Sequence, residues 1–78
     1  MKYIEGNVDL DNIFLEELPE WLSEVEVRGN FYCNNNQLTS LQGAPREVGG
    51  NFYCHNNEAK FTEEQVRAVC RVTGMVFV

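Results

Sequence analysis

Apolar and polar residues alternate in two short stretches of the chain that are almost identical. Residues 29–36 read GNFYCNNN and residues 50–57 read GNFYCHNN, so seven of eight letters agree at an offset of 21 residues. Successive side chains of a β-strand point to opposite faces, so each stretch predicts a short strand with phenylalanine and cysteine on its inner face. The asparagine run that follows predicts a turn out of the strand.

The alternation belongs to a longer repeat of the form apolar-x-apolar-x-x-Asn-x-apolar. A fainter copy lies upstream, in which Ile13 takes the place of the asparagine, and the first two units are 23 and 21 residues long. This is the spacing of a leucine-rich repeat, whose period is about 20–29 residues. The repeated positions are Val8, Leu10, Ile13 and Leu15; then Phe31, Cys33, Asn36 and Leu38; then Phe52, Cys54, Asn57 and Ala59.

The segments that return from one strand to the next differ between units. Pro19 favours the first turn of a short helix, and we expect Trp21 and Leu22 in that helix to pack against the core. The second return contains Gly43 and Pro45, which favour an extended or turned path. In each unit the asparagine is expected to bind backbone groups where the chain leaves the strand.

The third unit breaks off after Lys60 and the pattern changes. Residues 62–65 read TEEQ, a capping box that starts a helix, and apolar residues follow at helical spacing until Gly74 ends it. Residues 75–78 then read as a short apolar strand. Because the last coil of a solenoid exposes its core, this helix and strand predict a C-terminal cap.

The sequence therefore predicts an α+β fold: a short leucine-rich-repeat-like solenoid of two to three coils with a small parallel sheet, closed by a capping helix and strand. The 78 residues are expected to form one domain with a thin core. Within residues 1–78 the expected parts are repeat 1 (4–26), repeat 2 (27–47), a partial repeat 3 (48–61) and the cap (62–78).

The net charge of −6 is concentrated at the N-terminal end. Residues 1–26 hold eight acids against Lys2 alone, whereas residues 27–78 carry a net charge of +1. This field repels nucleic acid and favours either a basic protein surface or simple solubility. No apolar run approaches the about 20 residues of a membrane span, and the first residues lack a signal-peptide pattern, so a cytoplasmic protein is expected.

Candidate chemistry is sparse. Cys33, Cys54 and Cys70 with His55 equal the number of ligands in a structural zinc site, but no C-x-x-C spacing exists. Cys54 and His55 are neighbours on a strand and point to opposite faces, so His55 is not placed to activate that thiol. The side chains of adjacent acids such as Glu16 and Glu17 point in different directions, so they do not form an acid/base pair. We therefore expect no enzyme, metal or cofactor, and buried free thiols in a reducing compartment.

Stacking of the coils in register would align outward side chains into columns. Tyrosines and asparagines suit a protein-binding patch, although Tyr32 and Tyr53 are equally suited to a ladder that stabilises the sheet. An uncovered apolar edge at residues 75–78 would also invite dimerisation. The three expected columns are Asp9, Tyr32 and Tyr53; Asn7, Asn30 and Asn51; and Asp11, Asn34 and His55.

The segment NNNQLTSLQGAPREVGGNFYC resembles short repeats of bacteriophage proteins, in which N-N-Q-L-T-S-L and V-G-G-N-F-Y-C recur. Residues 15–22, LEELPEWL, resemble the Leu-Pro-rich short-repeat effectors of bacterial pathogens. Together these resemblances cover residues 4–61. Some such effectors carry a ubiquitin-ligase domain, for which this chain has no room. The phage resemblance implies an anti-defence inhibitor of the anti-CRISPR type that binds a host protein.

In that hypothesis the acidic segment occupies a basic, nucleic-acid-binding surface of the host protein, and the outward face adds shape-specific contacts. The alternatives are a self-associating assembly repeat with no host target and, less favoured, a metal or redox protein that uses the three cysteines. The candidate protein-binding residues are Asp9, Asp11, Glu16, Glu17, Glu20, Asn30, Tyr32, Asn34, Asn51, Tyr53 and His55.

Overall fold

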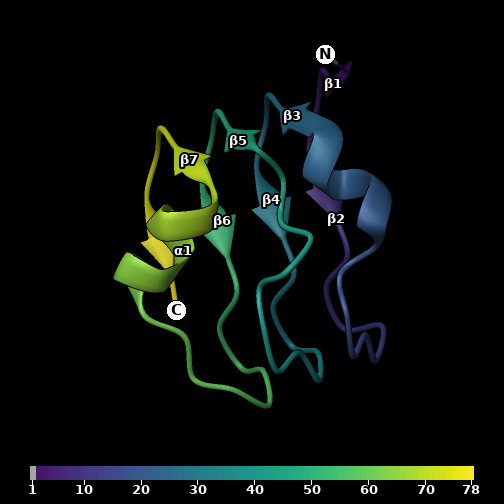
Figure 1. Ribbon diagram of the computed structural model, residues 1–78, viewed down its shortest axis with the longest axis vertical. Helices are drawn as coiled ribbons and strands as arrows, with labels where there is room; N and C mark the ends of the chain where they lie inside the picture. The colour runs from purple at the N-terminus through teal and green to yellow at the C-terminus, as the bar shows by residue number, and fades with distance from the viewer. Residues whose placement is uncertain (1) are drawn as a thin grey trace.

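The computed structural model describes residues 2–78, so residue 1 of the predicted domain lies outside the described part. The chain winds through stacked coils that build two parallel four-stranded sheets (Figure 1). The first sheet has the order β1-β3-β5-β7 and the second β2-β4-β6-β8, which confirms the predicted α+β solenoid. The strands are β1 Lys2–Ile4, β2 Val8–Asp9, β3 Val25–Val27, β4 Phe31–Tyr32, β5 Glu47–Val48, β6 Phe52–Tyr53, β7 Arg71–Val72 and β8 Val76–Phe77.

The sequence predicted one small sheet, and the second arises from a corner at each Gly-Asn pair. The backbone N–H of Gly29 donates to the carbonyl of Gly6, and the N–H of Gly50 donates to the carbonyl of Gly29, both at 3.0 Å. Beside them the side-chain Oδ1 of Asn30 accepts the N–H of Asn51 at 2.8 Å. The corner thus divides the extended segment of each coil into two short strands, one in each sheet.

The C-terminal residues extend both sheets. Helix α1 Glu63–Val69 returns the chain from the third coil, and β7 and β8 then add a fourth rung to each sheet. The predicted capping box is confirmed, because the Oγ1 of Thr62 accepts the N–H of Gln65 while the Gln65 side chain accepts the N–H of Thr62. The predicted closing strand is β8. The helix, however, ends at Val69 and not near Gly74, because the backbone is already extended at Cys70 and continues as β7.

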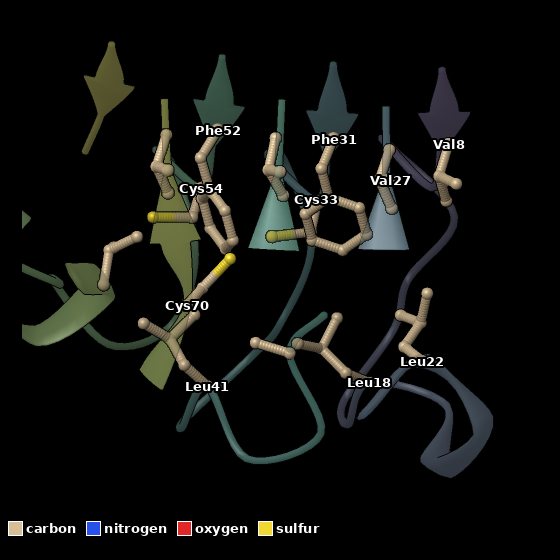
Figure 2. Packing of buried hydrophobic residues seen from close by; sticks show 14 of the residues in the cluster. Val8, Leu18, Leu22, Val27, Phe31, Cys33, Leu41, Phe52, Cys54 and Cys70 are labelled. Atoms are coloured by element: carbon tan, nitrogen blue, oxygen red, sulfur yellow. The ribbon is translucent and has the colours of Figure 1, made fainter. Parts of the chain in front are cut away.

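The core lies between the strands and the return segments. Figure 2 shows Val8, Phe31 and Phe52 pointing from the second sheet towards Leu18 and Leu41 of the returns. The rings of Phe31 and Phe52 meet with centroids 5.1 Å apart. In Figure 1 the helical segments lie on the viewer's side of the strands, so the opposite face of the second sheet is open.

One prediction in the first coil is wrong. The 3₁₀ helix η1 Glu20–Glu24 follows Pro19 as expected and buries Leu22, but Trp21 is 52% exposed. Neighbouring residues on a 3₁₀ helix point about 120° apart, so both cannot face the core. Ile13 is 51% exposed, in the turn position that asparagines fill in the later coils.

Within residues 2–78, no helix has the length and apolar content that a membrane crossing requires.

Candidate protein-binding face

The outward side chains of the second sheet form a stacked aromatic column. The register pairs Asp9 with Tyr32, Tyr32 with Tyr53, and Tyr53 with Phe77. The tyrosine rings stack at 4.6 Å between centroids and 14° between planes, and Phe77 stacks on Tyr53 at 4.7 Å and 7°. The predicted tyrosine register is thus present. Phe77 was missed, although VTGMVF at residues 72–77 has the valine, glycine and two-residue strand of VGGNFY.

The asparagine column is part of the architecture. The Oδ1 atoms of Asn7, Asn30 and Asn51 accept the backbone N–H groups of Asn30, Asn51 and Met75 at 2.7, 2.8 and 2.9 Å. The Nδ2 of Asn30 donates to the hydroxyl of Tyr32 at 3.2 Å, and Asn51 repeats this contact with Tyr53 at 3.3 Å. Asn30 and Asn51 therefore hold the tyrosines in place instead of offering free amides.

The third column behaves differently from its prediction. Asn34 was expected on the surface, but it is only 8% exposed, and its Oδ1 has no hydrogen-bond partner within residues 2–78. His55 is half-buried and meets the ring of Tyr53 edge-on at 6.4 Å. Neighbours in the stack cover a short side chain from both sides, which a strand pattern alone does not indicate.

Two carboxylates border the aromatic column. Asp9 is in register with Tyr32, and its Oδ1 accepts the backbone N–H of Asp11 at 3.1 Å. The hydrogen bond between the two side chains raises the pKa of Asp11 and lowers the pKa of Asp9. The column therefore ends at one side in exposed negative charge.

The other predicted acids are not part of this face. Glu16, Glu17 and Glu20 are exposed residues of the first return segment, where Glu17 and Glu20 line a hollow with Ser40 and Gly43 of the second return. Since Tyr32 points away from the core and the returns lie on the core's other side, these acids are separated from the aromatic column by the whole thickness of the coil. The candidate residues thus form two surfaces.

The three cysteines are free, buried thiols. Cys33, Cys54 and Cys70 are all buried and unpaired, and burial raises the pKa of Cys54 to about 11 and that of Cys70 to about 12. Burial likewise raises the pKa of the Cys33 thiol. No cluster of three or more His, Cys, Asp or Glu residues suited to a metal ion occurs in residues 2–78.

This burial predicts that the native protein resists thiol reagents. The thiolate is the attacking species, and a raised pKa together with burial removes it at neutral pH. We expect Ellman's reagent at about pH 8 to modify none of the three thiols within minutes in the folded protein, and all of them after unfolding in guanidinium. Rapid labelling of any thiol in the native state would contradict the described packing.

The fold defines a parallel-strand solenoid, a class in which each coil contacts only its neighbours and presents an extended surface. Comparison with protein-family models, with curated proteins and with solved structures finds no match to this chain. A functional proposal for it rests on the geometry of its surfaces.

Proposed function

We propose that this protein is a non-catalytic protein-binding module that contacts its partner through the outward face of the second sheet. The observation that carries the proposal is the stacked column of Tyr32, Tyr53 and Phe77. The tyrosines are half-buried and Phe77 is 37% exposed, so the column offers a continuous aromatic surface to a partner. Aromatic side chains of this kind supply most of the energy at many interfaces.

The column is also rigid before any partner arrives. Each tyrosine ring is held by stacking on its neighbour, and its hydroxyl is held by Asn30 or Asn51. Binding then loses little side-chain entropy, which favours affinity for a given contact area. The same stacking that stabilises the sheet therefore also prepares the surface.

The finer proposal is that the partner is a host defence protein with a basic, nucleic-acid-binding surface, met in the host cytoplasm. It is supported by the resemblance of the repeats to phage proteins and by the charge of the N-terminal third. The carboxylates of Asp9 and Asp11 adjoin the aromatic column, so a basic surface would gain both contacts at once. Such a protein would act as an anti-CRISPR-like inhibitor by excluding nucleic acid.

Self-association is the second candidate, because both ends of the solenoid have open strand edges. Strands β1 and β2 lie at one end of the sheets and β7 and β8 at the other. At the latter end Met75 is 63% exposed, and open apolar edges favour pairing with another chain. Light scattering that finds only monomer at high concentration would exclude this candidate.

Removing the two tyrosine rings tests the aromatic face. The double variant Tyr32→Thr with Tyr53→Thr keeps β-favouring residues but removes two of the three stacked rings, and we expect it to bind a captured partner at least about thirtyfold more weakly. The partner is captured from bacterial lysate on the immobilised protein, then purified and titrated by calorimetry. Tyr3→Thr, which removes an exposed tyrosine from the first sheet, is the matched control and should bind normally.

Equal affinities of the double variant and the wild type, both folded by circular dichroism, would eliminate the aromatic face as the binding site. The finer proposal has its own readout, the efficiency with which phage infect bacteria that carry an active CRISPR nuclease. Expression of the wild type should restore infection and the double variant should not. No restoration by the wild type, despite binding to a partner, would leave a protein-binding module without that role.

A further inference from the structure

The return side of the molecule, opposite the aromatic column, contains a groove between its two helical segments. The first coil returns through η1 and the third through α1, whereas the second returns without a helix (Figure 1). Two hollows adjoin this middle return, and both are lined by Ser40 and Gln42. Because they share these two residues, the hollows adjoin one another, and together they are called here the return groove.

One wall of the return groove is acidic. Glu17, Glu20 and Glu24 line the hollow beside η1, together with Ser40 and Gly43 of the second return. Glu16 and Glu58 line a neighbouring hollow that shares Glu17 and Ser40. No arginine or lysine lines any of these hollows, and the salt bridges found within residues 2–78 involve none of these glutamates. The negative charge on this wall is therefore not neutralised by the chain itself.

The other wall is apolar. Leu41, Phe61, Ala68 and Val69 line the hollow beside α1, which has a volume of about 550 Å³. Val69, the last residue of α1, is 48% exposed, and Ala68 beside it is also exposed. An apolar strip next to a row of carboxylates suits a ligand that is itself apolar on one side and cationic on the other.

We propose that the return groove binds a basic amphipathic segment of a partner protein, with its apolar side chains on Ala68 and Val69 and its lysines or arginines on Glu17, Glu20 and Glu24. Charge complementarity decides the occupant. The carboxylates repel nucleic acid and anionic lipid. A second copy of this chain is a poor occupant, because its basic residues occur singly along the sequence, and Arg28 and Arg67 are held in salt bridges.

The surface is independent of the aromatic face, because the core lies between them. The return groove gives the acidic N-terminal third a specific role. Its glutamates would recognise a basic polypeptide and would not imitate a nucleic acid. A partner could engage either surface alone. The two proposals can therefore fail separately.

The experiment uses a short fluorescein-labelled peptide in which pairs of lysines alternate with single leucines. Binding to the full chain is measured by fluorescence anisotropy, and the contact is mapped by amide chemical-shift changes in the ¹⁵N-labelled protein. We expect the largest changes at residues 40–43, 20–24 and 68–69. Changes spread over all acidic segments, or centred on the second sheet, would overturn the proposal.

Two matched pairs of variants test the walls. Glu20 and Glu64 each lie in the first turn of a helical segment, and Glu20→Gln should weaken peptide binding about threefold while Glu64→Gln leaves it unchanged. Val69 and Val78 are equally exposed at 48%, and Val69→Ser should weaken binding about fivefold whereas Val78→Ser should not. Equal effects within either pair would contradict the groove.

A peptide with glycine in place of each leucine separates recognition from simple charge attraction. It should bind about tenfold more weakly than the leucine peptide at physiological salt. Equal binding of the two peptides would mean that only charge is sensed and would overturn the amphipathic part of the proposal. The Tyr32→Thr, Tyr53→Thr double variant should bind the leucine peptide normally, which distinguishes this site from the aromatic face.

Discussion

Replacing Gly50 with alanine is expected to lower the free energy of unfolding by about 3–4 kcal/mol. A Cβ atom at position 50 would lie 2.9 Å from the carbonyl oxygen of Gly29 and still closer to the Oδ1 of Asn30. That Oδ1 accepts the N–H of Asn51 at 2.8 Å, so the methyl group must either separate two coils or break the corner hydrogen bond. Urea unfolding followed by circular dichroism measures the loss.

Gly6→Ala is the matched control, because Gly6 occupies the same corner position at the open end of the solenoid. A Cβ atom there would meet nothing within 4 Å. We expect its stability to stay level or to rise by up to about 0.5 kcal/mol, since alanine restricts the unfolded chain. Equal losses in the two variants would show that alanine destabilises the corner for a reason other than contact between coils.

Replacing Asn36 with alanine is expected to cost about 3–5 kcal/mol. Its Oδ1 accepts the N–H groups of Ile13 and Leu15, both at 3.0 Å. Its Nδ2 donates to three carbonyl oxygens, those of Leu10 at 2.8 Å, Cys33 at 3.1 Å and Asn34 at 3.2 Å. Alanine removes every one of these bonds at a buried position and leaves backbone groups of two coils without partners.

Asn57→Ala provides the graded comparison. Asn57 accepts one N–H, that of Leu38 at 3.1 Å, and donates to the carbonyls of Cys33 and Cys54 at 3.1 and 2.9 Å. It is also only half-buried, so we expect a smaller loss of about 2 kcal/mol in the same urea measurement. A loss at Asn57 that equals or exceeds the loss at Asn36 would contradict the view that the number of buried bonds sets the cost.

These contacts explain why the first unit tolerates Ile13 in the asparagine position. Each asparagine accepts N–H groups of the coil before it: Asn36 serves the first coil and Asn57 serves the second. Within residues 2–78 no coil lies before the first, so an amide at position 13 would have no such groups to bind. The exception in the sequence pattern is therefore consistent with the role of the asparagines.

Much of the fold could be predicted from local pattern. The identical phrases at residues 29–36 and 50–57 predict stacked coils, and the register pairs Phe31 with Phe52 and Tyr32 with Tyr53 as that repeat requires. The capping box at Thr62 has the same local origin, because its bonds join residues three apart. Such features depend on neighbours along the chain or on equivalent positions in the next coil.

Other features depend on contacts between coils that the spacing of residues in the sequence does not reveal. The corner that makes two sheets needs Asn30 and Asn51 side chains bound across coils, and the burial of Asn34 follows from the stacking of its neighbours. The exposure of Trp21 follows from the rotation of a short helix that already buries Leu22. Sequence spacing gives the face of a strand correctly, but it does not say which polar residue the next coil covers.

The sequence by itself determined that this protein is a stack of coils with alternating inner and outer residues, because one coil cannot bury its own apolar side chains. It also determined that Tyr32 and Tyr53 point outward, since the alternation of a strand assigns each residue to one face. Only the tertiary structure decided that Asn34 is buried and that the acids of the first return lie on a separate surface from the aromatic column. The physical reason is that both features depend on how whole coils pack against one another, and the residues involved are far apart in the sequence.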